Sequence, residues 1–197
     1  MGAIIFTVIA YLLGSVNTAI ITCKLLKCPD PRTEGSKNPG ATNVLRVAGR
    51  NAAILVLVAD ILKGFIAVLL AKIFGVSGMG LALVALGATI GHVFPLFYGF
   101  DGGKGVATAI GGILGLNLFV GIVTGLIWII TAGVTRLASL ASLVAIILAN
   151  VFILFVNPSY FIPVLGITAL VGWRHMQNIA RIRAGTEPQM DFSKIKS

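Results

Sequence analysis

A lysine between glycines is the feature of this chain that points most directly to chemistry. Lys104 lies in the run Gly102-Gly103-Lys104-Gly105, which follows one apolar stretch and precedes another. The bare backbone N–H groups of a glycine-rich turn, together with one ammonium group, form a concave site that suits a phosphate. Because the flanking stretches are apolar, we expect a phosphorylated molecule to be handled at a membrane surface.

A second candidate phosphate site is the loop over residues 32–46, which reads R-T-E-G-S-K-N-P-G-A-T-N-V-L-R. Its small hydroxyl and amide side chains, two glycines and flanking cations supply many hydrogen-bond donors on a flexible backbone, a composition suited to phosphate oxygens. An ordinary solvated loop has a similar composition. The prediction therefore depends on the other polar clusters.

Two pairs of polar residues repeat at a spacing of three. Ser139 and Ser142 begin one apolar stretch, and His175 and Asn178 end the last one. Residues three apart share a helix face. Hydroxyls near a helix N-terminus favour an anion, and a histidine beside an amide can orient a nucleophile or donate to an oxyanion. Serines in membrane helices also bond back to helix carbonyls, which is the structural alternative.

We interpret three other ionisable residues as structural. Asp60 and Lys63 lie three apart in the middle of an apolar stretch, so they form a self-compensating pair on one helix face. His92 stands near the end of another stretch and has no Cys, Asp or Glu at metal-ligand spacing. We expect all three to support the fold.

Several kinds of chemistry are disfavoured. The six carboxylates show no spacing typical of a two-carboxylate hydrolase or a two-metal site, and we predict neither a metal nor a cofactor. The lysine loop is not a Walker A motif, because Tyr98 occupies the place of the first glycine and Gly105 follows the lysine. The site is rich in hydrogen-bond donors for phosphate oxygens and poor in general bases. This combination favours a substrate that carries its own leaving group, such as an acyl phosphate.

The composition indicates a membrane environment. Of the 197 residues, 57% are apolar and 11% are charged, and the mean hydropathy is +1.02. These values lie outside the range of water-soluble domains. The net charge of +9 does not indicate nucleic-acid binding, because the basic residues fall between apolar stretches and not in a stripe with interleaved aromatics. We predict an integral membrane protein that contacts lipid and binds no nucleic acid.

The apolar stretches predict seven transmembrane helices, since about 20 residues cross the hydrocarbon. The ambiguous region is 106–134, which is long for one helix and short for two, and we place a turn near Leu116-Asn117. Glycines four apart predict close helix packing, as in Gly87 and Gly91, Gly111 and Gly115, and Gly121 and Gly125. The predicted spans are 3–22, 51–74, 79–97, 106–116, 119–134, 137–156 and 160–173.

Basic residues decide the number and direction of the spans. With seven helices, thirteen Lys and Arg side chains lie on one side and only Lys72 on the other, a strong positive-inside bias. Six helices would remove this asymmetry. We predict an all-α, polytopic integral membrane protein with its N-terminus outside and its C-terminus in the cytoplasm. Residues 1–190 form one seven-helix domain, followed by a short charged tail at 191–197.

Four motifs together resemble a known family. They are the loop G-S-K-N-P-G-A-T-N-V-L-R, the segment G-H-V-F-P-L-F-Y-G-F-D-G-G-K-G-V-A-T, the run T-R-L-A-S-L-A-S and the tail R-H-M-Q-N-I-A-R-I-R-A-G-T-E. In this order they are similar to the bacterial acyl-phosphate-dependent glycerol-3-phosphate acyltransferase (PlsY) family. The resemblance implies a seven-helix enzyme of the bacterial inner membrane whose active site faces the cytoplasm.

The implied reaction moves a fatty acyl group from acyl phosphate to the 1-hydroxyl of sn-glycerol 3-phosphate. Its products are lysophosphatidic acid and phosphate, the first step of phospholipid synthesis. The implied substrates are thus acyl phosphate and glycerol 3-phosphate, and the enzymes that make acyl phosphate are candidate protein partners.

The resemblance also implies roles for individual residues. The implied catalytic residues are Lys104, His175 and Asn178. Two departures from the family pattern, Lys37 in place of a glycine and Met176-Gln177 in place of a more charged pair, fall between the matched positions. The implied phosphate-binding residues are Ser36, Asn43, Arg46, Gly102, Gly103, Lys104, Gly105, Ser139 and Ser142.

The mechanism is only partly defined by these residues. Lys104 and Arg46 would neutralise the phosphates of donor and acceptor, and Asn178 or backbone N–H groups would stabilise the oxyanion. The hydroxyl proton goes to the departing phosphate, which we favour, or to His175. A small permease for a phosphorylated anionic solute is the alternative function, and it predicts polar residues in both halves of the bilayer. A scaffold for lipid enzymes would not need the Gly-Gly-Lys-Gly run.

Overall fold

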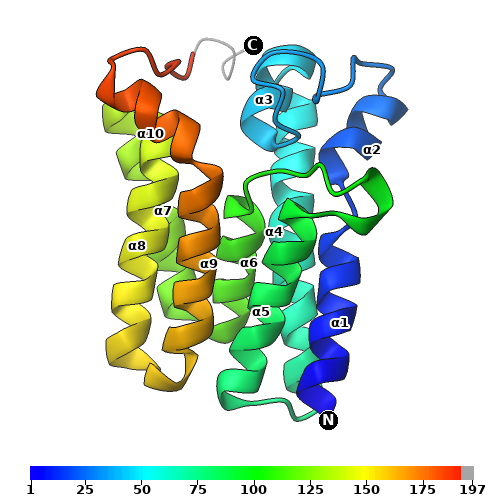
Figure 1. Ribbon diagram of the computed structural model, residues 1–197, viewed down its shortest axis with the longest axis vertical. Coiled ribbons are helices and arrows are strands. Elements are labelled where there is room, and N and C mark those ends of the chain that lie inside the picture. Colours follow the sequence, from blue (N-terminus) through cyan, green and yellow to red (C-terminus); the bar gives the residue numbers. More distant parts are fainter. Residues whose placement is uncertain (192–197) are drawn as a thin grey trace.

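The protein is a bundle of helices whose long members run side by side (Figure 1). The computed structural model describes residues 1–191, so the predicted charged tail lies outside the described residues except for Asp191. No strand occurs within 1–191. The α-helices are α1 (Gly2–Gly14), α2 (Thr18–Leu25), α3 (Ala41–Ala48), α4 (Arg50–Ile73), α5 (Gly78–Val93), α6 (Val106–Leu116), α7 (Leu118–Thr135), α8 (Ala138–Val156), α9 (Phe161–Arg174) and α10 (Met176–Arg183). Short 3-10 turns η1 (Leu96–Tyr98) and η2 (Pro158–Tyr160) precede α6 and α9.

Five helical stretches are long and apolar enough to cross a membrane: Gly2–Leu25, Arg50–Ile73, Gly78–Tyr98, Leu118–Thr135 and Ala138–Val156. Of the other two predicted spans, α6 has 11 residues and α9 has 14. Both are shorter than the roughly 17 to 25 residues of a full crossing. The helix lengths are thus those of a membrane protein with two shorter helices, of which α6 is largely buried.

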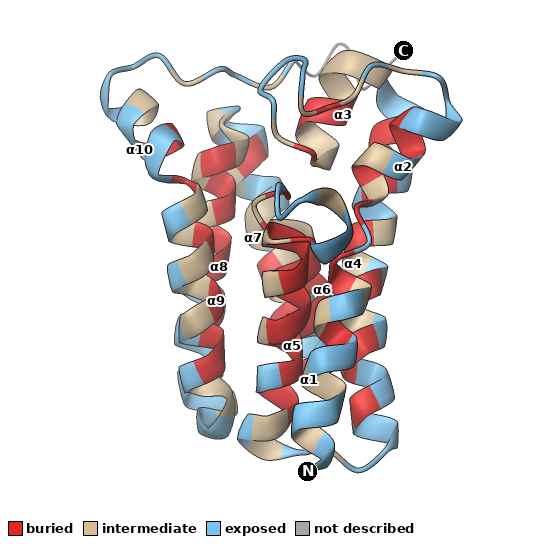
Figure 2. Ribbon diagram, turned by 45° about the vertical axis from the view of Figure 1, so that its right-hand side comes forward, coloured by how far each residue is buried: buried red, intermediate tan, exposed pale blue. Residues whose placement is uncertain are grey.

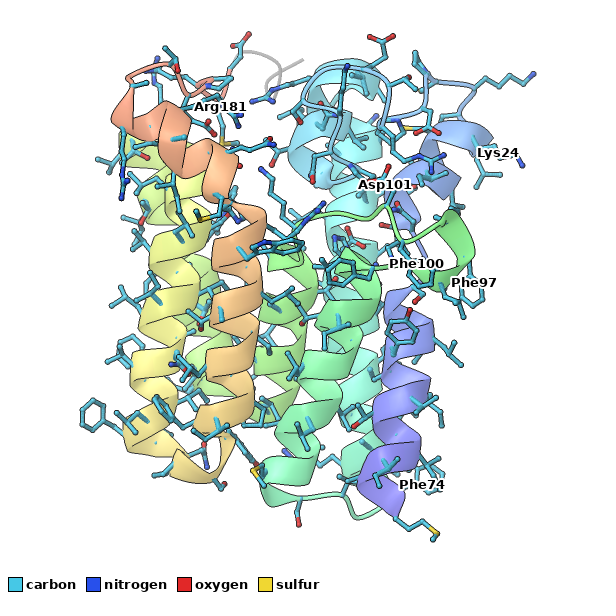
Figure 3. All side chains as sticks on the ribbon, in the orientation of Figure 1. Lys24, Phe74, Phe97, Phe100, Asp101 and Arg181 are labelled. Carbon is cyan, nitrogen blue, oxygen red and sulfur yellow. The ribbon has the colours of Figure 1, made fainter. Side chains whose placement is uncertain are left out.

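The outer surface of the bundle is apolar. Figure 2 shows buried residues on the inward faces of the helices and exposed residues on their outer faces. On α7 the exposed residues include Leu118, Phe119, Ile129 and Val134, each more than 60% exposed. Large apolar side chains in such numbers are stable against lipid and not against water. Figure 3 places Lys24, Asp101 and Arg181 at the end of the bundle opposite Phe74.

Glycines bring several helices into backbone contact, as predicted. A Cβ on Gly111 of α6 would overlap the Ile61 carbonyl of α4, and a Cβ on Gly91 of α5 would overlap the Tyr11 carbonyl of α1. Small residues at such crossings let helices approach closely in lipid. The prediction is wrong for Gly125, where an added Cβ would meet no atom within 4 Å.

The first predicted span, 3–22, is not one continuous helix. α1 ends at Gly14 and α2 begins at Thr18. The Asn17 side chain caps α2 by accepting from Ile20 N at 3.1 Å, and the Val16 carbonyl accepts from Lys63 Nζ at 2.9 Å. The helix can therefore stop at membrane depth because polar side chains replace its missing backbone partners.

A turn near Leu116-Asn117 is present. Asn117 separates α6 from α7 and caps α7 by accepting from Val120 N at 3.0 Å. Two helical segments were not predicted: α3 lies within the loop over 24–50, and α10 follows the last span. Both lie at the end of the bundle away from Met1 (Figure 1).

We predict that Gly111→Ala destabilises the protein by about 1–3 kcal/mol, because the added methyl group forces α4 and α6 apart. The measurement is the melting temperature of the detergent-purified protein. Gly133→Ala in α7 is the matched control, since its Cβ would meet nothing within 4 Å. Equal melting temperatures for the two variants would contradict a tight contact between α4 and α6.

Candidate active site

Most of the predicted site residues line one cavity of about 280 Å³. They come from four separate parts of the chain: the loop before α3 together with α3, the loop before α6, the start of α8, and the junction of α9 with α10. The predicted residues in the lining are Ser36, Asn43, Arg46, Lys104, Gly105, Ser139, Ser142, His175 and Asn178. Gly102 and Gly103 are buried but are not part of this lining.

Asn43 organises the first loop. Its Nδ2 donates to the carbonyls of Pro31 and Glu34 at 2.8 and 3.0 Å, and its Oδ1 accepts from Ser36 N at 2.8 Å. Gly35 has a φ of +61°, and a Cβ there would overlap Asn43 Oδ1. The amide of Asn43 is thus directed at the loop backbone, and it holds Ser36 at the cavity edge.

The glycine-lysine run forms the turn that leads into α6. Gly103 N donates to the His92 carbonyl at 3.2 Å, and Arg174 Nη2 donates to the Gly102 carbonyl at 2.9 Å. Gly105 caps α6 with a φ of +85°, a conformation that favours glycine. These contacts hold the turn from both sides and leave Lys104 facing the cavity.

The Lys104 ammonium binds Asn178. Its Nζ donates to Asn178 Oδ1 at 2.6 Å, and Asn178 Nδ2 donates to Glu187 Oε1 at 2.6 Å. An ammonium group only donates and a carboxylate only accepts, so the two neighbours fix the orientation of the amide. One of the two Nδ2 hydrogens of Asn178, the group that the sequence analysis assigned to the oxyanion, is donated to Glu187, which leaves the second hydrogen for another acceptor.

Glu187 is a site residue that sequence reasoning missed. Its Oε1 also accepts from Ser139 Oγ at 2.7 Å, and its Oε2 accepts from Arg181 Nε at 2.8 Å. No carboxylate is among the site residues that the sequence predicts, and Glu187 adds one to that set. The signal in the sequence was Gly185, because a glycine just after a helix often ends it and turns the chain. In the structure Gly185 has a φ of +69° after α10, and Glu187 follows it.

Burial and charge together shift the pKa values at this end of the protein. Burial, with the nearby guanidinium groups of Arg181, Arg174 and Arg46, lowers the pKa of Lys104 to about 8, although Glu187 acts in the opposite direction. Burial would raise the pKa of the Glu187 carboxyl. Hydrogen bonds from Asn178, Ser139 and Arg181 outweigh that effect and leave this pKa lowered.

His175 is a neutral, buried histidine at the junction of α9 and α10. Its side chain contacts the Val171 carbonyl through Nδ1 at 2.8 Å. A carbonyl can only accept, so Nδ1 carries the proton and Nε2 keeps a lone pair. Burial, followed by the charge of Lys104, lowers the pKa of His175 to about 4. The residue is therefore a weak base near neutral pH.

The part of the cavity that α4, α6 and α7 line is apolar. Its polar edge includes Ser142, whose Oγ accepts from Trp128 Nε1 at 3.0 Å and donates to the Ala138 carbonyl at 2.8 Å. Leu57 of α4 and Ile129 of α7 line this part and are 41% and 62% exposed. The apolar lining consists of Leu57, Ile61, Val106, Ala107, Ile110, Gly125, Trp128 and Ile129, from α4, α6 and α7.

Asp60 and His92, which we expected to be structural, also line the cavity. No group of three or more His, Cys, Asp or Glu side chains within residues 1–191 is arranged to hold a metal ion. The chemistry available from the described residues is therefore that of cations, hydroxyls and the carboxylates of Asp60 and Glu187 around a cavity that is partly apolar.

Known proteins match this chain over almost its full length. The glycerol-3-phosphate acyltransferase family model matches residues 4–185. Glycerol-3-phosphate acyltransferases of Coxiella burnetii (strain RSA 493 / Nine Mile phase I) and Vibrio vulnificus (strain YJ016) are 47% and 45% identical. The Coxiella alignment covers 96% of this chain and 99% of the relative, and the Vibrio alignment covers 98% and 96%.

Two solved structures share the fold. Both are crystal structures of PlsY (YgiH), an integral membrane glycerol 3-phosphate acyltransferase, one in a glycerol 3-phosphate form and one in a lysophosphatidic acid form. Each is 37% identical and covers 100% of this chain and 99% of its own, with TM-scores of 0.92 and 0.90. With the apolar helices, these matches establish that the chain is a membrane protein and belongs to the glycerol-3-phosphate acyltransferase (PlsY) family.

Proposed function

We propose that this protein transfers a fatty acyl group from acyl phosphate to the 1-hydroxyl of sn-glycerol 3-phosphate, giving lysophosphatidic acid and phosphate. The observation that carries the proposal is one cavity that joins a cationic, hydroxyl-rich end to an apolar end between α4 and α7. A reaction between a water-soluble phosphate and a lipid-like acyl donor needs a site whose polar end and apolar end are connected. A relative of this fold has been solved in forms named for the acceptor and for the product.

The proposed setting is the bacterial inner membrane, with the site facing the cytoplasm. If α6 and α9 cross the membrane together with the five long stretches, thirteen of the fifteen Lys and Arg residues of the sequence lie on the cytoplasmic side. Such an asymmetry is typical of cytoplasmic ends of membrane helices. The short α6 is largely buried and packs against α4, α5, α7 and α8, whereas α9 packs against α5 and α8 and exposes Ile162 and Trp173 on its outer face.

Lys104 and Arg46 receive the two phosphates. Lys104 precedes Val106, Ala107 and Ile110 of the apolar lining, so it is assigned to the phosphate of the acyl donor. Arg46 lies on α3 close to the Ser36 loop, so it is assigned to glycerol 3-phosphate. Asn43 acts on this site indirectly, because its amide shapes the loop that presents Ser36.

The chemical step replaces one acyl–oxygen bond by another. The 1-hydroxyl oxygen attacks the carbonyl carbon of the mixed anhydride, the new ester bond forms, and the bond from that carbon to the bridging phosphate oxygen breaks with its electron pair leaving on phosphate. The ammonium of Lys104 stabilises the charge that develops on the departing phosphate. Asn178 contributes by holding Lys104 through its Oδ1 at 2.6 Å.

The departing phosphate is the favoured acceptor of the hydroxyl proton. A general base works best when its pKa is near the operating pH. The pKa of His175 is lowered to about 4 and that of Glu187 is lowered too, so both are poor bases at neutral pH. A phosphate group has a second pKa of about 6, and the departing phosphate is already at the reacting carbon. His175 is then a neutral neighbour of the site and not the base.

The first prediction concerns the donor. Purified protein in lipid should release phosphate from palmitoyl phosphate only when glycerol 3-phosphate is present, and should not use palmitoyl-CoA. Lys104→Ala should reduce the rate by about 100-fold or more, because a charged donor to the leaving group is lost. Release of phosphate with no acceptor would indicate a hydrolase. Absence of turnover with either donor would favour the permease.

The second prediction concerns pH. Since the pKa of Lys104 is lowered to about 8, its ammonium is charged below pH 8 and loses its proton as the pH rises through 8. We expect kcat/KM for palmitoyl phosphate to fall above pH 8 by up to about tenfold per pH unit. Lys104→Arg keeps its charge over this range and should lack the decline. An identical decline in that variant would assign it to another group.

The third prediction concerns the acyl groove. Gly125→Leu adds a side chain where a Cβ meets no protein atom, so it should fill the apolar part of the cavity without strain. We expect KM to rise more for palmitoyl phosphate than for octanoyl phosphate, because each displaced methylene forgoes about 0.8 kcal/mol of burial. Gly133→Leu, on the same helix and outside the cavity lining, should leave both KM values unchanged. Equal effects on the two donors would place the acyl chain elsewhere.

A further inference from the structure

A cluster of charged and polar side chains surrounds Asp60, directly beneath the glycine-lysine turn. The carboxylate is almost fully buried, with its side chain 3% exposed. Asp60 Oδ1 accepts from Thr18 Oγ1 of α2 and lies next to Lys63 Nζ of α4, both at 2.8 Å. His92 of α5 approaches the same oxygen with Nδ1, at 3.4 Å. One carboxylate thus joins three helices.

The charge of Asp60 is already balanced without His92. Lys63 supplies the opposite charge and also donates to the Val16 carbonyl at the break between α1 and α2. An ionisable group at this depth is costly unless it has a partner or a function. His92 Nδ1 lies farther from Asp60 Oδ1, at 3.4 Å, than Lys63 Nζ does at 2.8 Å, so charge neutralisation of Asp60 does not explain why a histidine stands there.

The opposite side of the His92 ring contacts the glycine-lysine turn. A Cβ added to Gly103 would overlap His92 Nε2, so the ring lies directly against the Gly103 backbone. The same two residues are joined through the backbone, where Gly103 N donates to the His92 carbonyl at 3.2 Å. Gly102 also packs on position 92, but an added Cβ there would overlap the His92 carbonyl oxygen and not the ring.

We propose that His92, oriented by Asp60, is a positioning residue for Lys104: its ring supports the Gly103 backbone and thereby sets where the Lys104 ammonium lies. This inference rests on the proposed role of Lys104 in acyl transfer. The carboxylate faces one edge of the ring and Gly103 faces the other. The ring is therefore held between a fixed charge and the turn. Lys104 follows Gly103 directly, so a displacement of this peptide moves the ammonium relative to Asn178.

The test is a double-mutant cycle between positions 103 and 92. Gly103→Ala places a methyl group against the His92 ring and should lower kcat for acyl transfer by about 100-fold, the cost of a displacement near 1 Å at a reacting group. His92→Asn keeps a polar atom on the Asp60 side and lacks the ring tip. The double variant Gly103→Ala with His92→Asn should therefore recover at least about tenfold of the lost kcat.

The neighbouring glycine provides the matched control. Gly102→Ala meets a backbone carbonyl that no side-chain change at position 92 removes, so His92→Asn should not rescue it. His92→Asn alone should lower kcat and leave KM for glycerol 3-phosphate unchanged, because Arg46 and not Lys104 is assigned to that substrate. A general loss of folding would affect both parameters and both glycine variants.

A second readout does not depend on the reaction. Hydrogen exchange of the peptide over residues 101–106 should be faster in Gly103→Ala and return toward the wild-type rate in the double variant, because the Gly103 N–H bond to position 92 re-forms. If Gly103→Ala does not fold, recovery of folded protein by His92→Asn serves as the same test.

Additive effects at positions 103 and 92, or equal rescue of Gly102→Ala, would overturn the proposal. If wild-type protein shows no acyl transfer while the exchange pattern follows this expectation, the proposed function fails and the contact stands.

Discussion

The hydrocarbon of a bilayer offers no hydrogen-bond partners, so a polar group at membrane depth must find its partner within the protein. The break between α1 and α2 illustrates this constraint. The Val16 carbonyl is free of the helix and is bound by Lys63, whose own charge is balanced by Asp60. Thr18, at the start of α2, adds a donor to the same carboxylate. The polar cluster around Asp60 that makes the break possible therefore also contacts His92, and the His92 ring packs against the glycine-lysine turn.

Electrostatic balance explains the arrangement of the cavity mouth. Lys104, Arg46, Arg174 and Arg181 lie close enough for the three guanidinium groups to lower the pKa of Lys104. Glu187 is the carboxylate that opposes this repulsion, and it binds Arg181 directly while reaching Lys104 through Asn178. A site with this excess of positive charge is complementary to two phosphates. Burial, followed by the charge of Lys104, lowers the pKa of His175.

Glycine serves two opposite purposes in this protein. At Gly111 and Gly91 the missing side chain allows backbone contact between helices, and at Gly103 it allows contact with a histidine ring. At Gly125 the missing side chain leaves open space in the cavity lining. Spacing of four residues cannot distinguish these cases, because both place glycines on one helix face. Only the position of the neighbouring helix decides whether the face is packed or hollow.

The sequence by itself determined the membrane class, the turn at Asn117, the clustering of polar residues at one end and the family, because apolar length, charge asymmetry and local motifs are properties of the chain alone. It also indicated nine of the cavity-lining residues. It could not reveal that Glu187 contacts Ser139 and Asn178, or that the Asn178 amide lies between Lys104 and Glu187. Nor could it reveal that Gly125 faces space, or that the first span breaks at Val16. These features were decided by the tertiary structure, because each depends on which groups from distant segments meet where no water is available to satisfy them.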